Sequence, residues 1–86
     1  MAKVTIQYWA AARDAAGVAA ESVEAGTLAE ALEVIVARHG GDGRLRSVLA
    51  TSSFLIDGAP ASRRMASDLV LPDAARIEVL PQFAGG

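Results

Sequence analysis

A capped amphipathic helix lies between two strand-like segments at opposite ends of this 86-residue chain. Residues 27–30 read Thr-Leu-Ala-Glu, the capping-box pattern in which a threonine and a glutamate satisfy free backbone N–H groups at the start of a helix. The apolar residues that follow recur at helical spacing, and the pattern stops at His39, before two glycines. They are Leu28, Ala31, Leu32, Ile35 and Val36. A chain of this length holds one domain. We therefore expect a single hydrophobic core, packed against the apolar face of this helix.

Both ends of the chain predict strands because apolar and polar residues alternate there. Residues 3–9 (KVTIQYW) and residues 76–80 (RIEVL) show this alternation, with β-branched and aromatic residues at the apolar positions. The residues expected to face the core are Val4, Ile6, Tyr8, Ile77 and Val79. Since these two segments have the strongest alternation, we expect them to be neighbours at the centre of one sheet.

The remaining elements are shorter. The sequence predicts short helices over 10–16 and 44–50, a short strand within 18–24, a strand over 54–56, an edge strand within 59–65, and turns at 57–58 and 68–73. One main helix across one face of a mixed sheet of four to five strands is an α+β arrangement, the ubiquitin-like β-grasp. We expect the domain to cover residues 1–80 and residues 81–86 to form a flexible tail.

Composition excludes several classes of function. The chain has no Cys and a single His, which excludes disulfides, thiolate zinc sites and cysteine catalysis, and we expect no metal site. Its formal net charge of −2 does not favour binding to nucleic acid or to an anionic membrane. The apolar runs are too short for a signal peptide or a membrane span, so we expect a soluble cytoplasmic domain.

The chemistry of the sequence is concentrated in Gly85-Gly86, which follow the last predicted strand closely. A terminal carboxylate becomes an electrophile once ATP has converted it to an acyl-adenylate. Glycine permits the close backbone approach that a narrow activating site demands, because it has no side chain. Six residues from Pro81 extend about 20 Å, enough to enter a partner's pocket. No nucleophile–base pair and no phosphate-binding loop is recognisable in the sequence, so we do not expect the chain to be an enzyme alone.

Three segments resemble the MoaD/ThiS sulfur-carrier family. Residues 8–17 (YWAAARDAAG) are similar to the family's opening strand and helix, residues 56–58 (IDG) to the strand and turn after its main helix, and residues 77–86 (IEVLPQFAGG) to its closing strand and tail. The resemblance covers nearly the whole chain. It is strongest to the molybdopterin branch, the small subunits of molybdopterin synthase.

The resemblance implies a function in molybdenum cofactor biosynthesis. An E1-like adenylyltransferase would use ATP to adenylate the carboxylate of Gly86, and a sulfur donor would convert it to a thiocarboxylate. The tail would then enter the large subunit of molybdopterin synthase, in a heterotetramer, and supply sulfur for the dithiolene of molybdopterin. No cofactor would be bound to the chain itself. The residues implied in binding partners are Gly85, Ala84, Phe83, Pro81, Leu80 and Trp9.

Other interpretations remain open on the residues. The chain could be a thiamin- or cysteine-pathway sulfur carrier, a ubiquitin-like protein modifier joined to lysines through Gly86, or a plain ubiquitin-like binding domain. Trp9, on the polar side of its strand, fits either an interface or packing on the second sheet face. For His39 we favour a helix cap or core edge over proton transfer. Solvated arginines are favoured at 63–64 over a phosphate site, and turn aspartates at 68 and 73 over an acid pair.

Overall fold

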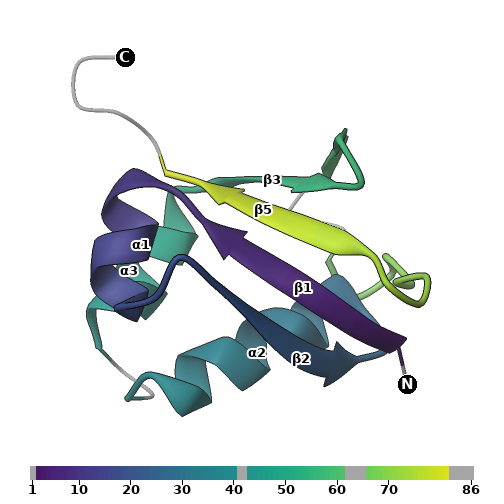
Figure 1. Ribbon diagram of the computed structural model, residues 1–86, viewed down its shortest axis with the longest axis horizontal. Helices are drawn as coiled ribbons and strands as arrows, with labels where there is room; N and C mark the ends of the chain where they lie inside the picture. The colour runs from purple at the N-terminus through teal and green to yellow at the C-terminus, as the bar shows by residue number, and fades with distance from the viewer. Residues whose placement is uncertain (1, 41–42, 62–65, 82–86) are drawn as a thin grey trace.

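The computed structural model describes residues 2–40, 43–61 and 66–81. The described elements, in chain order, are β1 (Ala2–Tyr8), α1 (Ala10–Ala16), β2 (Ala20–Ala25), α2 (Leu28–Arg38), α3 (Arg44–Ala50), β3 (Ser53–Ile56), β4 (Ala59–Ala61) and β5 (Arg76–Leu80). Figure 1 shows the strands in one layer with the helices behind it, on one face of the sheet.

The sheet confirms the expected position of the first and last strands. Its five described strands run in the order β2-β1-β5-β3-β4, with β1 parallel to β5. The pairs β1–β2, β3–β5 and β3–β4 are antiparallel. The last strand therefore occupies the centre of a mixed sheet, and the α+β, ubiquitin-like β-grasp prediction is confirmed.

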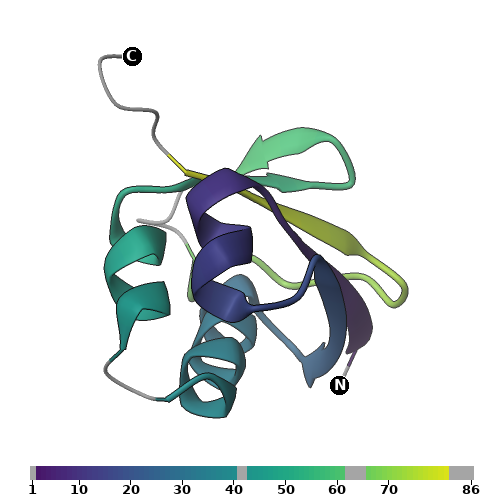
Figure 2. The same cartoon turned by 60° about the vertical axis from the view of Figure 1, so that its left-hand side comes forward.

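Helix α2 begins and ends where the sequence predicts. The Thr27 hydroxyl accepts the backbone N–H of Glu30 at 3.2 Å, and His39 is the C-cap. The buried residues of α2 are the predicted stripe, Leu28, Ala31, Leu32, Ile35 and Val36. Helices α1 and α3 pack against each other next to α2, as Figure 2 shows.

The core lies between the sheet and the helices. Apolar side chains from the inward face of β1, β3 and β5 pack against the buried apolar residues of α2 and the small buried residues of α1. The largest of them, each less than 2% exposed, are Tyr8, Phe54, Ile6, Leu28, Ile35, Leu45, Ile77, Val4 and Val79. Because every inward position of β1 and β5 is filled this way, the opposite face of these strands is left for polar or partner-binding residues.

Tight turns connect the strands. Asp57 and Gly58 have φ values of 50° and 85°, the left-handed pair that a two-residue hairpin between β3 and β4 requires. Gly17, with φ 80°, ends α1 by donating its N–H to the carbonyl of Arg13. Ala74, just before β5, also has a positive φ, 65°, which is costly for a residue with a Cβ atom.

Some element boundaries differ from the sequence expectation. Strand β1 ends at Tyr8 because Ala10 has φ 48° and turns the chain, which makes Trp9 the extended N-cap of α1. Strand β2 covers 20–25 and so ends one residue beyond the predicted range 18–24. The edge strand is present at 59–61, whereas the rest of its predicted range, 62–65, and the predicted tail residues 82–86 lie outside the described residues. Within the part of the chain that is described, no helix is long and apolar enough to cross a membrane.

Candidate functional site

Parallel pairing of β1 and β5 brings two residues far apart in sequence to the same end of the sheet. Tyr8 pairs with Val79, and the backbone N–H of Trp9 donates to the carbonyl of Val79 at 3.2 Å. Trp9 therefore lies beside Leu80, the last residue of β5. Both residues belong to the predicted binding set. The structure places them side by side at the end of β5, close in sequence to residues 82–86.

The indole of Trp9 is on the surface but has a fixed orientation. Trp9 is 42% exposed, and its indole Nε1–H donates to the Glu78 carboxylate at 3.2 Å. The two sequence interpretations of Trp9 were an interface and packing on the second sheet face. Among the described elements no second layer covers this face (Figure 1), so Trp9 does not pack beneath one there, and its place in an interface stays a prediction.

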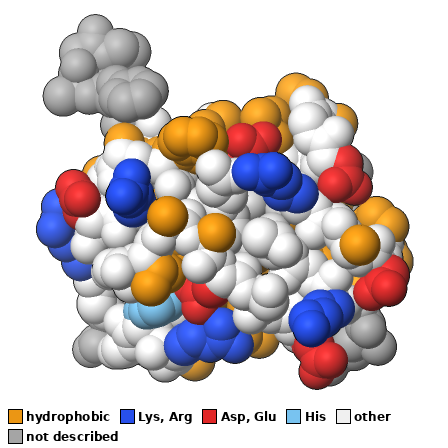
Figure 3. Space-filling view, viewed as in Figure 1, with side chains coloured by type: hydrophobic (Ala, Val, Ile, Leu, Met, Phe, Trp, Pro, Cys, Tyr) orange, Lys and Arg blue, Asp and Glu red, His pale blue; other side chains and the backbone are white. Residues whose placement is uncertain are grey.

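An apolar stripe crosses the open face of the sheet. We define it as Trp9, Leu80, Leu55 and Pro60. The register aligns Leu55 with both Glu78 and Pro60, so these residues share a face with Leu80. Leu80 and Leu55 are half-buried and Pro60 is exposed. Figure 3 shows this face, with hydrophobic side chains gathered along its upper edge, over β3 and β5.

Polar residues flank the stripe on the same face. The guanidinium of Arg76 donates to the side-chain carbonyl of Gln7, on the neighbouring strand. Lys3 and Glu24, which pair across β1 and β2, lie farther along the sheet. The open face thus has an apolar end at the C-terminal end of β5 and a charged end opposite.

Of the predicted tail residues, the structure describes only Pro81. Pro81 is buried directly after β5. The remaining predicted residues, Phe83, Ala84, Gly85 and Gly86, lie outside the described residues, as does the arginine pair at 63–64. The described residues of the predicted site are therefore Trp9, Leu80 and Pro81, and of these Trp9 and Leu80 lie on the open face.

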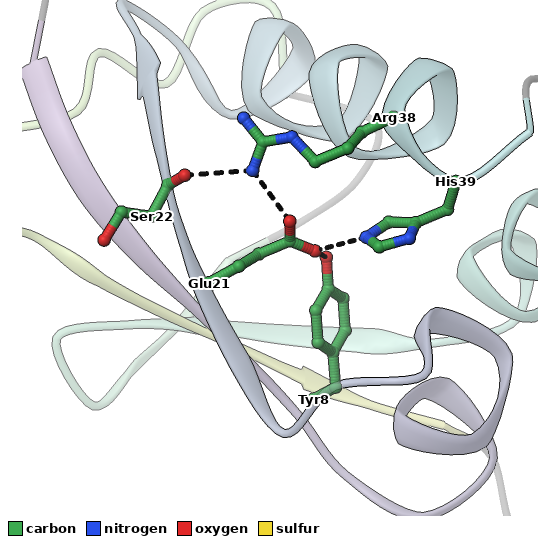
Figure 4. Close-up of polar contacts among 5 residues, drawn as sticks. All are labelled: Tyr8, Glu21, Ser22, Arg38 and His39. Carbon is green, nitrogen blue, oxygen red and sulfur yellow. Dashed lines mark hydrogen bonds and ion pairs between the residues drawn. The ribbon is translucent and has the colours of Figure 1, made fainter.

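A polar cluster on the opposite, helix-covered side was not predicted. Figure 4 shows the carboxylate of Glu21, on β2, between β1 and the C-terminus of α2. The Tyr8 hydroxyl donates to Glu21 Oε2 at 2.5 Å, and His39 Nε2 lies 2.5 Å from the same oxygen. Arg38 donates to Glu21 Oε1 at 2.7 Å and to the carbonyl of Ser22 at 3.1 Å. One sequence signal existed, because a buried tyrosine hydroxyl requires a hydrogen-bond partner.

Burial and hydrogen bonding shift two pKa values in this cluster. Burial raises the pKa of Tyr8 far above its ordinary value. The Glu21 carboxylate, which accepts a hydrogen bond from the Tyr8 hydroxyl, increases the shift. Desolvation alone would raise the pKa of Glu21, but the hydrogen bonds from Tyr8, His39 and Arg38 outweigh it and lower this pKa. Glu21 is therefore held ionised, and it ties β1, β2 and α2 together.

The other candidate residues have structural roles. His39 caps α2 and contacts Glu21, which agrees with the helix-cap interpretation. Asp73 lies in a turn, where its carboxylate accepts the backbone N–H of Lys3 at 3.0 Å. Asp68 also lies in a turn. Among residues 2–40, 43–61 and 66–81, no group of three or more acidic or histidine side chains could hold a metal ion.

The fold and the open face together define a class, the small ubiquitin-like β-grasp proteins. Within that class, the model of the ThiS family matches residues 6–86, nearly the whole chain. The chain therefore belongs to the ThiS family, the MoaD/ThiS sulfur carriers, as the sequence resemblance indicated. No curated protein matches the chain in sequence.

Solved structures agree on the fold at low sequence identity. A putative molybdopterin converting factor subunit 1 from Pyrococcus furiosus is 23% identical with a TM-score of 0.78, over 96% of this chain and 100% of that one. The small archaeal modifier protein 1 from Methanosarcina acetivorans is 23% identical with a TM-score of 0.75, over 100% and 98%. Subunits 1 and 2 of the molybdopterin-converting factor from Helicobacter pylori were solved as a complex, which matches at 19% identity and a TM-score of 0.69, over 98% and 99%.

Proposed function

We propose that this protein carries sulfur as a thiocarboxylate on Gly86 and serves as the small subunit of molybdopterin synthase. The observation that carries the proposal is the family match, which runs through Gly85-Gly86. The apolar stripe supports it, because it is exposed at the end of β5, six residues before Gly86.

The chemistry requires activation by another protein. The Gly86 carboxylate would attack the α-phosphate of ATP on an E1-like adenylyltransferase, forming an acyl-adenylate and releasing pyrophosphate. A sulfur donor at the sulfide oxidation level would then attack the acyl carbon, and AMP would leave. The thiocarboxylate sulfur would attack a carbon of cyclic pyranopterin monophosphate (precursor Z) and displace an oxygen from it, and water would hydrolyse the resulting thioester to restore the Gly86 carboxylate. The two sulfur atoms of one dithiolene would come from two carriers. The chain has no cysteine that could carry sulfur, so the carboxyl group of Gly86 is the group that we expect to carry it.

Trp9 and Leu80 would form the docking surface for both partners. An exposed Trp beside half-buried aliphatic residues is typical of binding hot spots. The complex of subunits 1 and 2 of the molybdopterin-converting factor from Helicobacter pylori supports a large-subunit partner for a chain of this fold. We propose a heterotetramer of two carriers and two large subunits.

The test is intact-mass analysis of the purified protein after incubation with ATP, Mg²⁺, an E1-like enzyme and a sulfur source. We expect one terminal oxygen to be replaced by sulfur, with fragmentation placing the change at Gly86. A thiol-directed reagent should then label only that chain end. A variant lacking Gly86 is the matched control and should stay unchanged. Sulfur incorporated elsewhere would refute the carrier role of Gly86.

A ubiquitin-like protein modifier is the second candidate. The likeness to the small archaeal modifier protein 1 favours it, although at 23% identity that likeness concerns the fold. The same activation would then end with an amide bond between Gly86 and a lysine of another protein. Conjugates in the incubation, detected as heavier species that contain the tail, would support this candidate.

The sulfur-transfer branch needs a further assay. Thiocarboxylated protein mixed with the large subunit of molybdopterin synthase and precursor Z should yield the dithiolene. Sulfur transfer only to a thiamin or cysteine precursor would instead assign the chain to one of those pathways.

A further inference from the structure

Glu78 places a carboxylate in the middle of the apolar stripe. It lies on β5, the central strand, and the register sets Gln7 on one side of it and Leu55 on the other. Leu80 is two residues farther along the same face, and Trp9 contacts the Glu78 side chain. Glu78 is half-buried even without a partner. A protein that covers the stripe must therefore cover this carboxylate as well.

The hydrogen bonds that the structure describes leave most of this carboxylate to solvent. Trp9 Nε1 donates to Oε1 at 3.2 Å. Arg76 lies two residues earlier on the same face, but its guanidinium donates to Gln7. A carboxylate has about four acceptor positions, so water must supply the donors for the others in the free protein.

Docking removes that water. Burying an ionised carboxylate without replacing its hydrogen bonds is strongly unfavourable, whereas a charged donor on the partner offsets the loss. An apolar partner surface that complements only Trp9, Leu80 and Leu55 would consequently be rejected. A surface that also places a cation over Glu78 would be accepted.

We propose that Glu78 is a specificity determinant of the apolar stripe, and that it selects partners which present an arginine side chain opposite β5. This inference rests on the proposed function, because it assumes that the stripe docks the large subunit or the activating enzyme. Arginine fits better than lysine because its planar guanidinium can donate to the free carboxylate oxygen and also stack on the Trp9 indole.

The experiment compares Glu78→Gln with Glu24→Gln. Glutamine keeps the shape and an oxygen that can accept from Trp9, but it removes the charge. Glu24 is exposed on the same face, at the edge strand β2, so its variant matches the change in net charge away from the stripe. Binding of each protein to the large subunit of molybdopterin synthase and to the E1-like enzyme is measured by calorimetry at several salt concentrations.

We expect Glu78→Gln to bind at least one of these partners about thirtyfold more weakly or worse, since the partner's cation is left buried without its counter-charge. Salt should weaken wild-type binding more than it weakens Glu78→Gln binding. Glu24→Gln should bind within about threefold of wild type. One arginine-to-glutamine variant of the partner should lose a similar factor, and that loss should not add to the loss from Glu78→Gln.

Three results would overturn the inference. Glu78→Gln binding as tightly as wild type, or more tightly, would show that no cation meets the carboxylate. Equal losses for Glu78→Gln and Arg76→Gln, with no sensitive arginine on the partner, would show that Arg76 supplies the charge from within the chain. If the wild-type protein binds neither partner, the proposed function fails first, and the inference fails with it.

Discussion

Replacing Glu21 with glutamine should destabilise the fold near neutral pH and have much less effect in acid. Glutamine offers one acceptor oxygen and an NH₂ group where the carboxylate now meets three donors, from Tyr8, Arg38 and His39. At least one of these donors must lose its acceptor, and the NH₂ group of glutamine must then face a second donor.

The size of the effect follows from the exposure of each donor. The Tyr8 hydroxyl belongs to a residue that is 1% exposed, so losing its acceptor costs about 1–2 kcal/mol. The His39 side chain is 18% exposed, and its contact is worth about 0.5–1 kcal/mol. The Arg38 side chain is 45% exposed, so solvent screens its ion pair to about 0.3–0.5 kcal/mol. Losing all three contacts would cost about 1.8–3.5 kcal/mol; because glutamine keeps one acceptor oxygen, we expect a loss of about 2–3 kcal/mol, which should lower Tm by about 10–20 °C.

The pH dependence tests the cause. The folded-state pKa of Glu21 is lowered from its ordinary value of 4.5, so its ionised form contributes stability above that pH. This contribution is lost as the pH falls through the lowered folded-state pKa, because the unfolded chain then binds the proton first. In urea unfolding, wild type and Glu21→Gln should differ by about 2–3 kcal/mol near pH 7, and by a clearly smaller amount at pH 3, because the contribution of the carboxylate starts to fall once the pH drops below 4.5.

Glu24→Gln, on the same strand but exposed, is the control and should stay within about 0.5 kcal/mol of wild type. If Glu21→Gln were no less stable than this control near pH 7, the cluster would have no energetic role. If its deficit were the same at both pH values, the deficit would not come from the charge of Glu21.

Three further predictions concern the stripe, the tail and the backbone. Trp9→Ala should weaken binding to the large subunit and to the activating enzyme by about 2 kcal/mol or more in calorimetry, and unchanged binding to both would give Trp9 a structural role only. Deleting Gly86 should abolish thiocarboxylate formation, measured by mass spectrometry, and should leave Tm unchanged, because a free terminal residue contributes little to packing. Ala74→Gly should raise stability by about 0.5–1 kcal/mol in urea unfolding, since it relieves a φ of 65°, whereas Ala37→Gly in the exposed part of α2 should lower it by about 1 kcal/mol.

Local patterns were enough to predict most of the fold. Alternation placed Val4, Ile6 and Val79 in the core, and the Thr27 cap and the helical spacing after it defined α2. What could not be predicted were the features that depend on contacts between distant segments. Strand β2 ends one residue beyond the predicted range 18–24, because its register is set by pairing with β1 and its own alternation is weak.

The same limit applies to the site. Trp9 and Leu80 were predicted as binding residues, and the parallel pairing brings them together. The Glu21 cluster was missed because it joins residues 8, 21, 38 and 39, whose proximity depends on where α2 ends above β2. The position of Glu78 among apolar neighbours was likewise invisible, since Leu55 reaches it only through the β3–β5 register.

The central position of β5 has a consequence for how the protein is made. Residues 76–80 are the last strand to be synthesised, yet they fill the gap between β1 and β3. Until they arrive, β1 and β3 each lack one neighbour, and closing the sheet must join segments about 70 residues apart in sequence, as in the pairing of Thr5 with Arg76. Contacts of such long range slow folding. Completing the sheet and forming the apolar stripe are therefore one event, so an incompletely folded chain would lack the surface that we propose for docking.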